Sequence, residues 1–222
     1  MAVTQGASTQ RAAGRHSLIG LLGCVGFSVV SLLGYATPLA VQLMVLTGLA
    51  LPLAWGAVTR EWGAMGFTRR NLSRALGWGV AAGLVTSVLG IVMIGERVPP
   101  ARLGLELVVG IPLWLLAASP FQEFFFRGWL QSRWERGMGR GVGLVATTAV
   151  FTLWHYCWPL GAQSSFPLYT VKGLAATFAA GLVYGYSFQR TGNIVTPWLA
   201  HALAGVAFLC IGAGSFASAL QR

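Results

Sequence analysis

Residues 103–128, LGLELVVGIPLWLLAASPFQEFFFRG, decide the fold class of this chain. The first part of this stretch, 103–119, is a long apolar run, and about 20 apolar residues are enough for a helix to cross a hydrocarbon core. The whole chain is 55% hydrophobic and only 9% charged, whereas a soluble domain usually carries about 25% charged residues. We therefore predict an all-α integral membrane protein that folds as one compact helix bundle.

Seven apolar runs of this kind follow one another along the chain. The predicted spans are 17–34, 38–57, 76–95, 103–119, 141–157, 168–188 and 194–214. Their continuously apolar pattern excludes a β-barrel, whose strands would alternate. Residues 120–140 either continue the fourth span or form a separate half-helix. We therefore predict a polytopic bundle of about seven to eight transmembrane helices, with a polar N-terminus at 1–16 and a single transmembrane domain at 17–214.

The net charge of +10 is spread over the loops between these runs. Because the basic residues do not gather on one face, the charge does not indicate a nucleic-acid partner. Placing the N-terminus in the cytoplasm puts ten basic residues on the inner side and three on the outer side, which agrees with the positive-inside rule. The abundance of Ala, Gly, Arg and Leu is typical of a bacterial protein. We therefore predict an inner (plasma) membrane protein with a cytoplasmic N-terminus and the membrane lipid around it.

Three ionisable residues, Glu123, His155 and His201, lie in three separate apolar segments. Such groups cost at least ~2–3 kcal/mol each at membrane depth, so they are rarely kept there without a partner or a task. Ser119 and Pro120 are typical of a helix start. This start would put Glu123 in the first turn of a new helix, with Arg127 one turn further along the same face as an ion-pair partner.

These residues allow two kinds of chemistry. A buried carboxylate can act as a general base on water, and imidazoles can stabilise a developing oxyanion. Glu123, His155 and His201 also match a catalytic zinc ligand set with water in the open position, so a divalent metal such as zinc is an open alternative. Both routes lead to hydrolysis of an amide bond. A structural salt bridge and two packing histidines are the simpler interpretation of each residue taken alone.

The three residues also stand in three ordered motifs. These motifs are Gln122-Glu123-x-x-x-Arg127, Phe151-x-x-x-His155 and His201-x-x-x-Gly205. Together with Gly66–Leu72 and Thr191–Asn193, they resemble the CAAX prenyl protease and bacteriocin-processing (CPBP, or Abi) family of intramembrane proteases, over roughly residues 66–210. The resemblance implies an intramembrane endopeptidase that acts on a membrane-bound or lipidated peptide or protein. In that reading Glu123, Arg127, His155 and His201 are the catalytic residues.

Two positions depart from the family pattern. Gln122 stands where the family has its first glutamate, which is argued to activate water, and Gly205 replaces an asparagine expected to assist the oxyanion. Glutamine cannot act as a base, so Glu123 would have to take that role. The alternative function is a catalytically silent member that serves as a membrane scaffold, a chaperone or an immunity-type binding protein.

Overall fold

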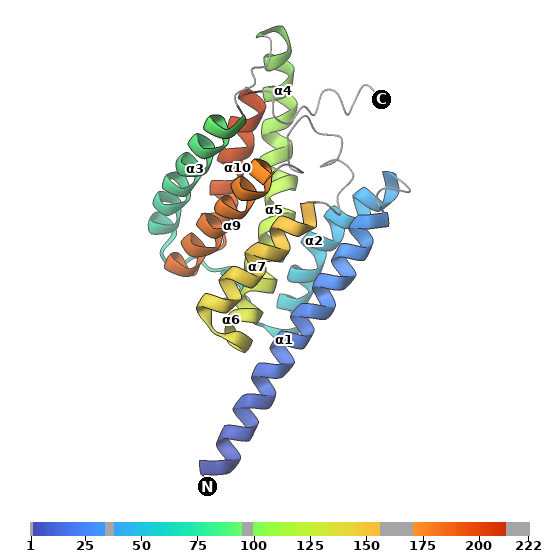
Figure 1. Cartoon of the computed structure of the whole chain (residues 1–222), viewed down its shortest axis with the longest axis vertical. Helices are drawn as coiled ribbons and strands as arrows, with labels where there is room; N and C mark the ends of the chain where they lie inside the picture. Colours follow the sequence, from blue (N-terminus) through green and yellow to red (C-terminus); the bar gives the residue numbers. More distant parts are fainter. Residues whose placement is uncertain (1, 34–37, 95–99, 156–170, 212–222) are drawn as a thin grey trace.

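The computed structural model of this chain describes residues 2–33, 38–94, 100–155 and 171–211. The helices outside the central segment are α1 (Ala2–Leu33), α2 (Pro38–Thr59), α3 (Leu72–Ile94), α7 (Arg140–Trp154), α9 (Val171–Thr191) and α10 (Val195–Cys210). One continuous helical segment runs from 100 to 138 between α3 and α7. The described residues are thus an all-α bundle of seven helical stretches (Figure 1), which confirms the predicted fold class.

Within the described ranges, four helices are long and apolar enough to cross a membrane. They are Ala12–Leu33, Gln42–Thr59, Leu72–Met93 and Leu103–Met138. Arg140–Trp154 and Val195–Cys210 are shorter apolar helices. The helices start and end within a few residues of the predicted spans, with two exceptions. The first helix, α1, begins at Ala2, well before residue 17, and the helical segment of the predicted fourth span continues to Met138, well beyond residue 119. The last residues of the predicted fifth and seventh spans, and the first of the sixth, lie outside the described residues.

The central segment alternates between α-helix and π-helix. It consists of α4 (Pro100–Leu113), the π-helical η1 (Trp114–Ala118), α5 (Ser119–Glu123), the π-helical η2 (Phe124–Gln131) and α6 (Ser132–Met138). The segment 120–140 therefore continues the fourth span through residue 138. The predicted helix start at Ser119 is wrong, because Ser119 has helical φ and ψ of −70° and −47° and its backbone N–H bonds to the carbonyl of Trp114.

The π-helical turn of η1 explains why the helix does not break at Pro120. A proline inside an α-helix loses one hydrogen bond, and its ring collides with the carbonyl four residues earlier. The wider π turn, with bonds to the fifth residue back, changes the spacing of the carbonyls just before Pro120. In a membrane such local adjustments let a helix continue through a proline.

α10 packs most extensively along α3 and also contacts α4, α5 and α9 (Figure 1). Three glycines of α3, Gly79, Gly83 and Gly90, face α10. A Cβ at Gly83 or Gly90 would collide with Leu203 or Phe208 of α10, and a Cβ at Gly79 would be tightly crowded by α10. Small residues let helix backbones approach closely in lipid, where packing rather than water exclusion holds helices together. This close approach fixes α10, and with it His201, in the bundle.

A cluster of buried aromatic rings joins α1, α5, η2 and α7. Phe27 of α1 stacks on Phe125 with ring centroids 4.1 Å apart and on Trp154 at 5.5 Å. The Trp154 indole N–H also donates to the Ser31 hydroxyl at 2.8 Å. The buried indole N–H of Trp154 therefore has an acceptor. The stacked rings hold α1 and α7 against the central segment.

Arginine residues are frequent at the end of the bundle where α2 ends and α3 begins, which we call the arginine-rich end. They include Arg60, Arg69, Arg70 and Arg74. Gly66 and Asn193 link two loops there, since Ile194 N–H donates to the Gly66 carbonyl at 2.9 Å. The amide of Asn193 donates to the carbonyls of Thr68 and Arg70 at 3.0 and 2.9 Å. The family-like stretches 66–72 and 191–193 thus contact each other and close this arginine-rich end.

Glu61 neutralises part of the charge at the arginine-rich end. One of its oxygens, Oε2, accepts hydrogen bonds from Trp55 Nε1 at 3.2 Å, Arg136 Nη2 at 3.3 Å and Arg133 Nη1 at 3.5 Å. Burial raises the pKa of the Glu61 carboxyl, but the bonds from Arg136 and Trp55 and the two arginine charges outweigh burial and lower that pKa below 4.5. The carboxylate therefore ties α2 to α6 when it is ionised.

We predict that Glu61→Gln lowers the melting temperature of the purified protein at pH 7 by roughly 2–4 °C, which corresponds to about 1 kcal/mol. Because the pKa of Glu61 is lower in the folded than in the unfolded chain, this stabilisation is fully present above about pH 4.5 and is lost as the pH falls through the folded pKa. The difference between parent and variant should therefore vanish in acid. A difference that stays constant down to pH 3 would contradict this, and Arg69→Gln, an exposed change in the same loop, serves as the control.

Candidate functional site

The carboxylate of Glu123 is fully buried at the junction of α5 and η2. Its Oε1 accepts a hydrogen bond from Arg127 Nη1 at 3.1 Å and another from His201 Nδ1 at 2.6 Å. The Glu123–Arg127 pair has the predicted spacing of one helical turn, with the glutamate first, which is the favourable order. The negative charge is thus matched by one cation from its own helix and one imidazole from α10.

The guanidinium of Arg127 is fully buried as well, and its other groups also find partners. Nη2 donates to the carbonyl of Gly181 on α9 at 3.2 Å. The guanidinium carbon lies 4.1 Å from the ring centroid of Phe151 and 5.4 Å from that of Tyr184. Hydrogen bonds and cation–π contacts of this kind make a buried arginine tolerable and fix its orientation.

The imidazole of His201 is held between aromatic rings. It stacks on Tyr184 with a centroid distance of 5.0 Å and an interplanar angle of 19°, and Trp114 lies 5.5 Å away. An ionised carboxylate oxygen can only accept a hydrogen bond, so Nδ1 of His201 carries the proton that is donated to Glu123. The hydroxyl of Tyr184 in turn donates to Thr86 of α3 at 3.4 Å.

His155 lies directly after α7, beyond the ring of Phe151. Its Nδ1 is 2.7 Å from the Phe151 carbonyl oxygen and must donate to it. The Phe151 ring is 4.7 Å from the His155 ring and 6.1 Å from the His201 ring. The structure therefore joins Glu123, Arg127 and His201 directly and puts His155 across one shared aromatic ring from them.

Two buried oxygen atoms beside this cluster accept no hydrogen bond from the described residues. They are Oε2 of Glu123 and Oε1 of Gln122. Buried polar atoms are nearly always bonded, so such acceptors mark a place where a polar molecule is expected. Consecutive residues thus offer a carboxylate oxygen and an amide oxygen to water or to a substrate.

The predicted zinc ligand set does not assemble in the structure. No group of three His, Cys, Asp or Glu side chains among the described residues is placed to hold a metal ion. His201 Nδ1 contacts Glu123 directly, and His155 Nδ1 is bonded to a backbone carbonyl. The arrangement of these donors fits a hydrogen-bonded carboxylate and imidazole pair and does not fit a three-ligand metal centre.

Trp114 fills the space that a side chain at position 205 would need. A Cβ at Gly205 would overlap Cδ2, Cε3 and Cε2 of the Trp114 indole. The departure at Gly205 is therefore matched by a large residue on η1, and the indole lies beside His201. Position 205 cannot take an asparagine here without displacing this ring.

Sequence reasoning missed three residues that the structure puts in or near the bundle interior. Tyr184 and Trp114 contact His201, but a single aromatic residue in an apolar span carries no signal of its role. Glu106 is buried on α4. It could have been found, because it lies inside the predicted span 103–119 and satisfies the criterion that selected Glu123.

A polar cluster enclosed by apolar helices defines an integral membrane protein with an internal site. Residues 104–207 match the family described as type II CAAX prenyl endopeptidase, Rce1-like. This segment is just under half of the chain, contains Glu123, Arg127, His155 and His201, and is similar to that family, which confirms the resemblance seen in the sequence. No curated protein and no solved structure matched the chain.

We predict that Gly205→Asn destabilises the protein by about 1–3 kcal/mol, because overpacking a well-filled interior costs energy of this order. Trp114→Ala in the same chain should relieve the collision, so the double variant should be more stable than the sum of the single effects by about 1 kcal/mol or more. Gly77→Asn is the matched control, since a Cβ at Gly77 meets nothing within 4 Å. Equal losses for Gly205→Asn and Gly77→Asn in a denaturation experiment would refute the collision.

Proposed function

We propose that this chain is an intramembrane endopeptidase that hydrolyses a peptide bond in a membrane-embedded or lipid-anchored substrate, with Glu123 as the general base. One observation carries the proposal. The carboxylate is fully buried, one of its oxygens is fixed by Arg127 and His201, and the other oxygen has no donor among the described residues. A fixed carboxylate with one open oxygen is suited to take a proton from water.

The proposed reaction uses these groups in order. Oε2 of Glu123 takes a proton from a water molecule, and the water oxygen attacks the carbonyl carbon of the substrate peptide bond. The carbonyl oxygen becomes an oxyanion. Because Nδ1 of His201 and of His155 already donates to Glu123 and to the Phe151 carbonyl, Nε2 of each neutral ring is proposed to hold the water by accepting a hydrogen bond from it, and a ring would donate to the oxyanion only with a proton on Nε2. When the tetrahedral intermediate collapses, the proton on Glu123 passes to the leaving amine, and the carboxylate is restored.

Arg127 acts in this scheme as a positioning residue. It binds Oε1 and leaves Oε2 open, and its bond to the Gly181 carbonyl and its contact with Phe151 hold it in place. The guanidinium of Arg127 also places a positive charge directly beside the Glu123 carboxylate.

The substrate class follows from the family and the depth of the site. The family is named for endopeptidases that act on prenylated CAAX tails, so the first candidates are C-terminal peptides with a lipidated cysteine. The lipid would anchor the tail in the bilayer that the apolar helices require. We place the arginine-rich end and the N-terminus in the cytoplasm of a bacterial inner membrane, where the positive-inside rule and the composition favour them.

A farnesylated C-terminal peptide incubated with the purified protein in liposomes tests the proposal. We expect cleavage, followed by mass spectrometry, and a loss of kcat of about 10²–10⁴-fold in Glu123→Gln, the size of a general-base effect. The glutamine keeps an oxygen that can accept from Arg127, so the variant should still fold. His201→Gln should also lose activity.

Glu135→Gln is the matched control, because Glu135 lies on α6 and accepts hydrogen bonds from Gln131 and Gln189, away from Glu123. Its turnover should stay within about twofold of the parent. Melting temperatures establish that each variant is folded. Turnover by Glu123→Gln equal to that of the parent would overturn the assignment of the base.

One observation favours the silent alternative. Gln122 is buried beside Glu123, and an amide cannot replace the carboxylate that the family pattern has there. A chain that binds a lipidated peptide without cutting it would need the same buried cluster for stability. It would then act as a scaffold, a chaperone or an immunity-type binding protein.

Gln122→Glu separates the two functions. If the parent is an enzyme, this change should raise kcat by no more than about tenfold, since the parent already has its general base. An inert parent and an active Gln122→Glu variant, with the same peptide under the same conditions, would establish the silent function. Trp114→Ala with Gly205→Asn, added to Gln122→Glu, extends the comparison to the full family pattern without the collision.

A further inference from the structure

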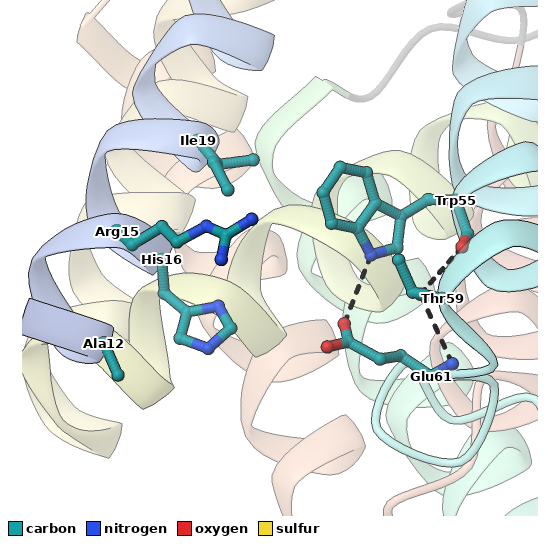
Figure 2. A pocket seen from close by; sticks show the side chains of 7 residues that line it. All are labelled: Ala12, Arg15, His16, Ile19, Trp55, Thr59 and Glu61. Atoms are coloured by element: carbon teal, nitrogen blue, oxygen red, sulfur yellow. Dashed lines mark hydrogen bonds between the residues drawn. The ribbon is translucent and has the colours of Figure 1, made fainter. Parts of the chain in front are cut away.

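A pocket with charged side chains in its wall lies at the arginine-rich end, between α1 and α2, and Glu123 does not line it. Its volume is about 440 Å³, and Ala12, Arg15, His16, Ile19, Trp55, Thr59 and Glu61 line it. In Figure 2 the side chains of Arg15 and His16 reach from α1 toward Trp55 and Glu61 on the opposite wall. The catalytic scheme uses none of these residues.

The groups at and behind the pocket are predominantly cationic. Arg133 and Arg136 bind Glu61 at 3.5 and 3.3 Å, and Arg15 lines the same pocket as Glu61, so three guanidinium groups accompany a single carboxylate. With His16 neutral, the cluster carries a net charge of +2. Its composition favours an anion.

Several of these donors have unused capacity. The side chains of Arg15 and His16 line the pocket and form no hydrogen bond or ion pair within the described part of the chain. Arg133 lies behind the pocket, fully buried with its guanidinium carbon 4.0 Å from the Trp55 ring, and it contributes charge. An anion with several oxygens could accept from the side chains in the wall of the pocket.

The surroundings of the pocket select a lipid over a free anion. Leu18, Leu22, Val25 and Val29 follow Arg15 at intervals of three or four residues, and they are exposed by 56, 63, 54 and 51%. Residues at this spacing share one face of a helix. A molecule with its head at Arg15 would therefore have an apolar stripe of α1 for its acyl chain. Trp55 also lies near the end of α2, and tryptophan near the end of a span is typical of the headgroup level of a bilayer.

We propose that the pocket between α1 and α2 binds the phosphate headgroup of an anionic phospholipid, with its acyl chain along the exposed apolar face of α1. Arg15 and His16 are the contacts from α1, and the cation cluster around Glu61 supplies the field from behind. The site is distinct from the proposed catalytic cluster, so it stands whether or not the chain is an enzyme.

Native mass spectrometry of the full chain in detergent tests this site. We expect phosphatidylglycerol to bind more tightly than phosphatidylcholine with the same acyl chains. Arg15→Gln should weaken phosphatidylglycerol binding about fivefold, which is the effect of one basic residue near a membrane surface. Binding of phosphatidylcholine should not change. Arg15 is exposed, so the variant should fold, and its melting temperature verifies this.

Arg74→Gln is the control, since Arg74 is an exposed arginine on α3. We expect it to retain the preference for phosphatidylglycerol. Equal losses in Arg15→Gln and Arg74→Gln would mean that only general surface charge attracts the lipid, and the proposal would fail. Displacement of the lipid by millimolar inorganic phosphate would show that the pocket takes free phosphate, which would also overturn the assignment to a lipid.

Discussion

The charge of Glu123 sets the main constraint on this bundle, because an ionised carboxylate among apolar helices needs partners in fixed positions. Breaking a buried ion pair by removing one partner costs about 3–5 kcal/mol. Arg127 follows one turn later on the same helix, so this part of the pairing is local. His201 comes from α10, 78 positions further along the chain. The bond between Glu123 and His201 therefore requires α10 to lie against α5, and the packing of the other helices must allow it.

Four elements cooperate to meet this requirement. The glycines of α3 let α10 approach closely, α9 supplies the ring of Tyr184 and the carbonyl of Gly181, and α7 supplies Phe151. Each contact orients either Arg127 or His201. The same contacts that stabilise the charge in the membrane thus also fix which oxygen of Glu123 is bound and which is open. Stability and the proposed chemistry rest on one set of interactions.

The sequence predicted the spans well because continuous apolar runs have one low-energy solution in lipid, the helix. It also predicted the Glu123–Arg127 pair, since that contact depends only on helical spacing. The predicted helix start at Ser119 was wrong for two reasons. Inside a bilayer the backbone N–H and C=O groups must find hydrogen-bond partners within the helix, which outweighs the local capping signal. The π-helical η1 also accommodates Pro120 without a break. The contacts of His201 with Tyr184 and Trp114 could not be predicted, because they depend on how distant helices pack.

The two departures from the family pattern have different physical meanings. Gly205 is compensated, since Trp114 fills the space of the missing side chain and packs beside His201. Gln122 changes the charge balance instead. One arginine pairs with one carboxylate in this cluster, so a second carboxylate at position 122 would add a buried negative charge beside the one that Arg127 already pairs. Gln122 removes that charge and keeps an amide oxygen at the same place. The buried cluster therefore has one charge fewer to compensate than the family pattern, and Glu123, the proposed base, is still present.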